Sequence, residues 1–289
     1  MNNNVKSGKK PALEVDDVSL KMKVSENEIS FERITEKERR KLTYRPFDCT
    51  GCGMCFRACP VDAVIPGPSG VILKGLEKAP HMVLSPDTCT LCGICAEVCL
   101  FNVIDVEIDG KNVKDLPDYA RYKKGYKFAS EKCKPKEGLL CKDCEDACPR
   151  DAIKAKLEGD KNTIVRGEKL CIYCSNCEKA CPEDAIKVEK IFDGEIEVDL
   201  ETCTGCSLCF DICPSGSVTL PRPEKPGDRP DKIKIDTEIC AFCGACEHVC
   251  PVDAIVIKRK KANYIKSEGK SWSKAWEKAF SDMLEEVEE

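Results

Sequence analysis

The sequence predicts an α+β fold composed of small modules with short hairpins, short helices and little other regular structure. The main observation is a cysteine pattern, Cys-x2-Cys-x2-Cys-x3-Cys, which occurs six times, once with altered spacing; one copy is CTGCSLCFDICP at residues 203–214. All 24 cysteines of the 289-residue chain belong to these copies. Strand-like segments such as DAIKV at residues 184–188 follow the copies, usually after a proline that would end a short helix. Modules this small bury too little surface to be stable through a hydrophobic core alone, so bound metal is expected to hold them together.

The cysteine spacing matches the ligand run of bacterial-type [4Fe-4S] ferredoxins, in which four thiolates bind one iron-sulfur cube. Disulfide bonds are the first alternative, but the start of the chain has no apolar segment typical of a secretory signal, and clustered cysteines in a reducing compartment usually bind metal. Zinc is the second alternative, but structural zinc sites usually combine two distant Cys-x-x-Cys pairs. The spacing therefore predicts six [4Fe-4S] clusters with 24 cysteine ligands in a cytoplasmic chain. Such clusters move single electrons at low potential, which predicts an electron conduit.

Charged residues of both signs are mixed along the whole chain. The 46 Lys and Arg and the 51 Asp and Glu give a formal net charge of −5, which argues against nucleic acid as a partner. No apolar run approaches the length of a membrane span. Motifs for dinucleotides or nucleotide phosphates are absent, and one of the two histidines, His248, is expected on the exposed side of a short helix. We therefore expect no catalytic residue and no enzyme activity in this chain itself.

The chain is expected to divide into five segments. Residues 1–43 contain no cysteine and are expected to form an N-terminal arm that lies along a partner subunit, with a disordered tail as the alternative. Three tandem ferredoxin domains, each with two clusters, are expected at residues 44–130, 131–195 and 196–260. Residues 261–289 are expected to form a C-terminal docking helix.

In the first ferredoxin domain the copies are CTGCGMCFRACP and CTLCGICAEVCL, and Leu100 takes the place of the usual proline in the second. The alternating run VIDVEIDGKNV that follows predicts a hairpin with its turn at Asp109 and Gly110. The long segment 101–130 is expected to contain the first domain boundary.

The third copy departs from the pattern, because seven residues separate Cys133 from CKDCEDACP at residues 141–149. A short loop insertion would still let Cys133 reach the same iron cube, since closing a loop of a few residues costs little entropy. The alternative is a three-cysteine cluster with an open iron, which an enzyme subunit could use.

Two further features concern the connections after the fourth copy. The run AIKVEKIFDGEIEVDLE, residues 185–201, predicts two strands joined by a tight turn at Asp193 and Gly194, between the fourth and fifth copies. The proline-rich segment PRPEKPGDRP, residues 221–230, predicts an exposed, mobile loop.

The fourth cysteine of each copy is expected to serve a different cluster from the first three. It lies beside a short helix and points away, so in two-cluster ferredoxins it binds the partner cluster. Neighbouring copies are expected to pair, although copies four and five could instead form a ferredoxin inserted between copies three and six. With neighbours paired, the six ligand sets are Cys49, Cys52, Cys55 and Cys99; Cys89, Cys92, Cys95 and Cys59; Cys133, Cys141, Cys144 and Cys181; Cys171, Cys174, Cys177 and Cys148; Cys203, Cys206, Cys209 and Cys250; and Cys240, Cys243, Cys246 and Cys213.

The residues after Lys261 change character. Trp272, Trp276, Phe280, Leu284 and Val287 fall on one stripe of a predicted helix. Two interpretations remain: the stripe docks onto another subunit, or it packs on the last ferredoxin module.

Six ferredoxin motifs in one chain resemble an archaeal polyferredoxin. The stretch ERRKLTYRPFDCTGCGMCFRACPVDAV, with Gly67, Pro68 and Gly70 soon after, and the segment SWSKAWEKAF are similar to the polyferredoxin subunit of formylmethanofuran dehydrogenase. This resemblance implies electron relay to or from a separate tungsten- or molybdenum-pterin subunit that interconverts CO2 and formate in methanogenic or methanotrophic archaea. Its implied partners are the catalytic and electron-carrier subunits of a larger redox complex, and other ferredoxins. A polyferredoxin of a hydrogenase or heterodisulfide reductase complex would share every cysteine feature.

Overall fold

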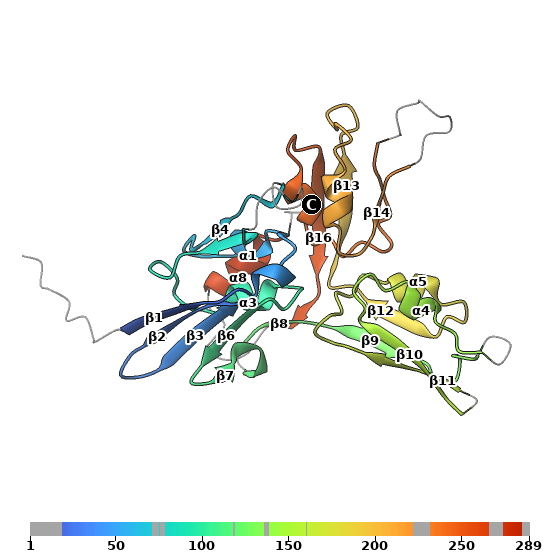
Figure 1. Cartoon of the computed structure of the whole chain (residues 1–289), viewed down its shortest axis with the longest axis horizontal. Helices are drawn as coiled ribbons and strands as arrows, with labels where there is room; N and C mark the ends of the chain where they lie inside the picture. Colours follow the sequence, from blue (N-terminus) through green and yellow to red (C-terminus); the bar gives the residue numbers. More distant parts are fainter. Residues whose placement is uncertain are drawn as a thin grey trace, which may run out of the picture.

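The computed structural model describes residues 19–70, 75, 79–117, 119–135, 139–159, 161–221, 232–265 and 274–284. Three lobes meet near the middle of the molecule, and each lobe contains one pair of short helices (Figure 1). The pairs are α1 (Met54–Arg57) with α3 (Ile94–Val98), α4 (Asp143–Asp146) with α5 (Asn176–Ala180), and α6 (Leu208–Ile212) with α7 (Ala245–Val249). We call the lobes modules 1, 2 and 3 in this order. Short strands and one-turn helices make up the fold, which confirms the α+β class.

Backbone conformation limits these helices to about one turn. Five of the six begin directly after a residue in the left-handed region, where glycine and a few polar residues are tolerated best. Each of the six is followed, at once or after one residue, by the fourth cysteine of its motif. The left-handed residues are Gly53, Gly93, Ser175, Ser207 and Gly244.

The N-terminal part of the chain belongs to module 1. Strands β1 (Ser19–Val24), β2 (Ile29–Ile34), β3 (Arg39–Tyr44), β6 (Ile104–Ile108) and β7 (Lys111–Asn112) form one antiparallel sheet in that order. Phe31, Leu42 and Tyr44 are at most 1% exposed, so they anchor the sheet to the module. The expected arm at residues 1–43 is therefore wrong from residue 19 onward, while residues 1–18 lie outside the described part.

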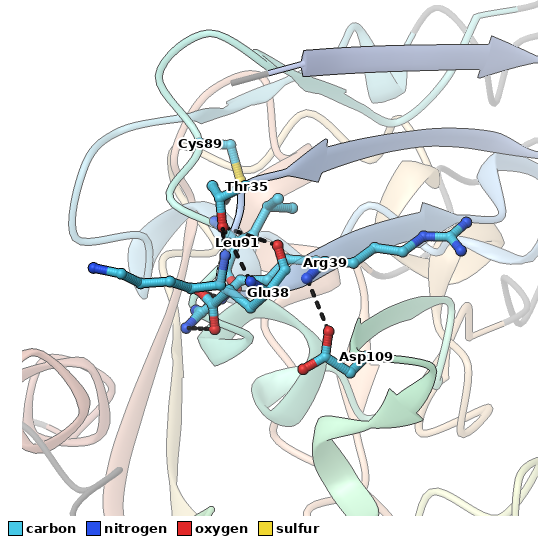
Figure 2. A network of polar contacts seen from close by, with 8 residues as sticks. Thr35, Glu38, Arg39, Cys89, Leu91 and Asp109 are labelled. Carbon is cyan, nitrogen blue, oxygen red and sulfur yellow. Dashed lines mark hydrogen bonds and ion pairs between the residues drawn. The ribbon is translucent and has the colours of Figure 1, made fainter. Parts of the chain in front are cut away.

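Two turns of this sheet lie close to the second cysteine motif. Figure 2 shows the β2–β3 turn, with Thr35 and Glu38, near Cys89 and Leu91. The backbone N–H of Arg39 donates to Asp109 Oδ1 at 2.9 Å, which joins this turn to the β6–β7 turn. In the β6–β7 turn Asp109 and Gly110 have φ values of 49° and 78°, and Ile108 pairs with Lys111, so the predicted hairpin is confirmed.

Smaller elements complete module 1. They are the 3-10 turns η1 (Pro46–Asp48) and η2 (Val113–Asp115), and the hairpin of β4 (Val64–Pro66) with β5 (Met82–Leu84).

Strand pairing shifts the boundary between modules 1 and 2. Strand β8 (Arg121–Tyr122) pairs with β17 (Tyr264–Ile265), whereas β9 (Gly125–Phe128) pairs with β12 (Ile186–Glu189) of module 2. The division therefore falls near residues 123–124, earlier than the expected residue 130. In module 2, β10 (Ile153–Glu158) and β11 (Lys161–Arg166) form a further hairpin.

The hairpin expected between the fourth and fifth motifs does not form. Strand β12 pairs with β9, and β13 (Phe192–Val198) pairs with β16 (Ile255–Ala262) of module 3. The register shifts between Asp193 and Gly194, and a Cβ at Gly194 would collide with the carbonyl oxygen of Lys258. The Asp-Gly pair thus forms a bulge inside a strand instead of a turn. Module 3 also contains β14 (Val218–Thr219) paired with β15 (Lys234–Ile235), and residues 222–231 of the proline-rich segment lie outside the described part.

The C-terminal helix α8 (Lys274–Ser281) packs on module 1. Phe280 stacks on Tyr264 with a centroid separation of 4.6 Å, and Trp276 meets the edge of Tyr119 at 5.5 Å. Trp276 and Phe280 are 4% and 0% exposed. These two side chains are therefore unavailable as docking anchors, and the helix covers module 1 instead of the last module. Trp272 and Val287 lie outside the described residues.

The modules touch one another directly. Phe56 of α1 packs against His248 of α7 at 5.2 Å, and Arg57 Nη2 donates to Glu247 Oε2 at 2.8 Å. His248 is thus half-buried between modules 1 and 3, which corrects its expected exposed position. Among the described residues, no helix combines the length and apolar character needed to cross a bilayer.

Candidate iron-sulfur sites

The cysteines are free thiols, and the short helices fix their directions. The third cysteine of each motif lies inside a helix, as Cys55 does in α1 and Cys177 in α5. The fourth cysteine follows at the end of the same helix, as Cys181 does after α5. At Cys99, Cys181, Cys213 and Cys250 the backbone leaves the helix in an extended conformation, so the fourth cysteine does not follow the helical arrangement of the third.

Three small cavities are each lined by four cysteines. In every case three cysteines come from one motif and one from the end of the neighbouring motif, the arrangement expected for crossed ligation. The cavities are lined by Cys59, Cys89, Cys92 and Cys95, which we call site II; Cys148, Cys171, Cys174 and Cys177, site IV; and Cys203, Cys206, Cys209 and Cys250, site V.

The remaining cysteines gather in three further groups. Burial, together with the neighbouring thiols of Cys133, Cys141 and Cys181, raises the pKa of the Cys144 thiol to about 11. Burial likewise raises the pKa of Cys246 well above its ordinary value, with Cys240 and Cys213 as its nearest cysteine neighbours. The groups are Cys49, Cys52 and Cys99, to which we add Cys55 as the third cysteine of the same motif, site I; Cys133, Cys141, Cys144 and Cys181, site III; and Cys213, Cys240, Cys243 and Cys246, site VI. Raised pKa values mean that buried thiolates need a bound metal to be stable.

Cys133, the displaced first cysteine of the third motif, lies within site III. The thiols of Cys141 and Cys181 are close enough to raise its pKa, after the larger effect of burial. The inserted loop therefore brings Cys133 to its partners despite the altered spacing.

A repeated turn holds the fourth cysteine of most motifs. The backbone N–H of Ala63 donates to Cys59 Sγ at 3.2 Å, and the same contact recurs at Ala152, Ala185 and Ala254. The residue before each of these alanines is an aspartate with positive φ, a conformation that Asp tolerates better than most residues. This explains the recurring Cys-Pro-x-Asp-Ala sequence: Asp makes the turn and the Ala amide stabilises the sulfur. The aspartates are Asp62, Asp151, Asp184 and Asp253, with φ of 50–51°.

Buried polar atoms beside the thiols fit an iron-sulfur cluster. The hydroxyls of Tyr44 and Tyr126 and the side-chain amide of Asn162 are buried without a well-aligned hydrogen-bond partner among the described residues. Tyr44 lies next to Cys49, Tyr126 next to Cys177, and Asn162 next to Cys133. A buried donor without an acceptor is costly, and the sulfurs of a bound cluster would supply one. The donor set therefore fits clusters at sites I, III and IV.

Several polar residues near the thiols were not predicted from the sequence. Asn176 Nδ2 lies 3.4 Å from Cys174 Sγ, and Ser217 Oγ lies 3.3 Å from Cys213 Sγ. Arg166, at the end of β11, lies beside Cys171. Asn176 stands inside its motif and could have been suspected from CSNC, and Arg166 stands five residues before Cys171 in the sequence. Tyr126 reaches Cys177 only through the pairing of β9 with β12.

Comparison with known proteins agrees with this geometry. The family model described as a 4Fe-4S dicluster domain matches residues 21–63, 139–185, 170–217 and 202–254, and a 4Fe-4S binding domain matches residues 86–102.

One similar protein is the polyferredoxin protein FwdF of Methanocaldococcus jannaschii, which is 40% identical over 104 residues. The match covers 36% of this chain and 29% of that protein, so the chain matches less than a third of its relative's length.

A solved structure resembles nearly the whole chain. It is a chain of the formate dehydrogenase, heterodisulfide reductase and formylmethanofuran dehydrogenase complex from Methanospirillum hungatei, with a TM-score of 0.78 and 27% identity over 94% of this chain and 93% of that one. Together these similarities confirm the resemblance to archaeal polyferredoxins. Because the dicluster matches cover more than half of its residues, the chain belongs to the family of 4Fe-4S dicluster domain proteins.

Proposed function

We propose that this chain is the electron-relay subunit of a formylmethanofuran dehydrogenase complex and carries single electrons through six [4Fe-4S] clusters. The observation that carries the proposal is the set of cavities at sites II, IV and V, each closed by cysteines from two motifs. Such crossed ligation is characteristic of two-cluster ferredoxins. We assign all 24 cysteines as ligands in the six sites defined above.

Close approaches between modules support relay from one module to the next. Cys52 of site I lies near Cys243 of site VI. Cys99 of site I and Cys171 of site IV line the same small cavity. Lys190 lies near both Cys174 of site IV and Cys240 of site VI. One site of each module thus faces the other two modules, so electrons would not need to follow the order of the sequence.

The proposed host, meaning the enzyme complex to which this chain would belong, rests on the two similar proteins. The relatives are a polyferredoxin and a chain of a complex named for formylmethanofuran dehydrogenase. We infer that a separate tungsten- or molybdenum-pterin subunit performs the chemistry on CO2 or formylmethanofuran, and that this chain performs none. The many free thiols favour the reducing cytoplasm as its compartment.

A second host has specific support, because the complex that contains the similar chain is also named for heterodisulfide reductase and formate dehydrogenase. Anaerobic affinity purification of the native complex tests this choice. Co-purified formylmethanofuran dehydrogenase subunits with tungsten or molybdenum support the first host. Recovery with only hydrogenase or heterodisulfide reductase subunits would refute it.

Metal analysis tests the relay itself. Anaerobically prepared chain is expected to contain about 24 irons and 24 acid-labile sulfides, since each cluster has four of each. A content of about 20 to 23 irons with an open-iron signal would favour the alternative in which Cys133 is not a ligand. Fewer than about 12 irons, or zinc in their place, would contradict the proposal.

A further inference from the structure

Site IV is surrounded by polar side chains that approach three of its four cysteines. Arg166 lies beside Cys171, and Asn176 Nδ2 lies 3.4 Å from Cys174 Sγ. The buried Tyr126 hydroxyl lies beside Cys177. The fourth cysteine, Cys148, accepts the backbone N–H of Ala152 at 3.3 Å.

The Arg166 guanidinium is held firmly in this position. Its Nη1 donates to the Tyr173 hydroxyl at 3.1 Å, and the group lies over the rings of Tyr126 and Tyr173 at 4.6 and 5.4 Å. The side chain is 16% exposed, whereas that of its acidic partner Glu168 is 80% exposed. Water screens Glu168 more than it screens Arg166, so a net positive field remains at site IV.

Site III, in the same module, has a different polar environment. The neutral amide of Asn162 lies beside Cys133, and the carboxylate of Glu183 also acts on this cysteine. Tyr126 lies near Cys144 as well as Cys177, so its hydroxyl dipole acts on both sites. Site IV has the more positive surroundings, because Arg166 lies beside Cys171 and Arg150 lines the same cavity.

Site IV lies close to modules 1 and 3, whereas site III, in the described part of the chain, does not. Cys171 shares a cavity with Cys99 of module 1, and Asn176 Nδ2 donates to the Ser215 carbonyl of module 3 at 2.7 Å. In contrast, Cys133 and Cys181 of site III lie beside each other and near residues of module 2. Site IV is thus the site of module 2 that faces the other modules.

We propose that Arg166, assisted by Asn176, gives the cluster at site IV a higher reduction potential than the cluster at site III. Adding an electron makes a cluster more negative, so a nearby positive charge and hydrogen bonds to its sulfurs stabilise the reduced form. One electron then passes from the reduced cluster at site III, which returns to the 2+ state, to the cluster at site IV, which goes from 2+ to 1+. No bond or proton changes. Module 2 would therefore draw electrons inward, toward the sites of modules 1 and 3.

The inference rests on the proposed clusters and is tested by dithionite titration of the full holo chain, followed by electron paramagnetic resonance. Cys171→Ala and Cys133→Ala assign the signals, because each should remove the signal of one site. The site IV signal is expected to develop at higher potential than the site III signal. Arg166→Gln should shift the site IV signal to more negative potential, and Arg166→Lys, which keeps the charge, should shift it less.

Arg39→Gln is the matched control, because Arg39 pairs with Glu32 on the exposed surface of module 1. It should leave every potential unchanged. An unshifted site IV signal in Arg166→Gln, or a site III signal that develops first in the unmodified chain, overturns this inference while the iron content still supports the clusters. If a cysteine variant does not fold, the comparison between Arg166→Gln and Arg39→Gln still decides whether one cluster responds to Arg166.

Discussion

Replacing Phe280 by alanine should release the C-terminal helix from module 1. Phe280 is 0% exposed, stacks on Tyr264 at 4.6 Å and meets the edge of Tyr122 at 5.8 Å. Removing a fully buried phenylalanine costs about 3–5 kcal/mol. A helix as short as α8 is not stable in water without tertiary contacts, so a loss of this size should undock it.

Hydrogen exchange of the holo chain, read by mass spectrometry, measures this change. Amides of α8 and of the β8–β17 pair should exchange at least about a hundredfold faster, since each 1.4 kcal/mol corresponds to a factor of ten. Lys278→Ala is the control, because Lys278 is exposed on the same helix and its loss should change stability by less than about 0.5 kcal/mol. Unchanged exchange at β8 and β17 in Phe280→Ala, with loss of a partner subunit instead, would show that the helix docks outward and that our reasoning is wrong.

Three further predictions concern the clusters and the bulge in β13. Cys133→Ala and Cys181→Ala should each lose about four irons and the same cluster signal, because both thiols belong to site III although they lie in different motifs; loss of different signals would contradict this grouping. Gly194→Ala should lower the free energy of unfolding by about 1–3 kcal/mol, because its Cβ would collide with the Lys258 carbonyl, whereas Gly167→Ala, with only ordinary contacts, should have little effect in thermal unfolding. Removing iron with a chelator should abolish most of the circular dichroism of the modules, because the buried cysteines would be left without the metal that fixes them; a native-like spectrum of the stripped chain would refute this.

The N-terminal and C-terminal segments show why tertiary structure could not be predicted from local patterns alone. Residues 19–43 were expected to belong to an arm, yet β3 pairs with β6, a strand about 60 residues later, and with β2 on its other side, so Phe31, Leu42 and Tyr44 are buried. The C-terminal stripe was predicted correctly as a helix, but its target was not. An apolar stripe predicts that one face of the helix is buried, but it does not specify which part of the protein covers that face.

The two Asp-Gly dipeptides also show that one local pattern can adopt different structures. Asp109-Gly110 makes the turn that the sequence predicted, and Asp193-Gly194 makes a bulge inside a strand. Both dipeptides permit unusual backbone angles, but the partner strand decides whether they form a turn or a bulge. For β13 that partner is β16, more than 50 residues away, and not the adjacent β12.

Cysteine spacing by itself determined the cofactor chemistry, the α+β class and the short helices, because ligation of an iron-sulfur cube needs three thiolates from one loop and a fourth from elsewhere. These requirements are local, so they can be recognised directly from the spacing of the cysteines in the sequence. Only the tertiary structure decided that Tyr126 stands beside site IV, that Cys52 faces Cys243, and that Phe280 of α8 packs against Tyr122 of module 1. Such contacts join residues tens to hundreds of positions apart, and they depend on how strands pair and how modules pack, which no local spacing specifies.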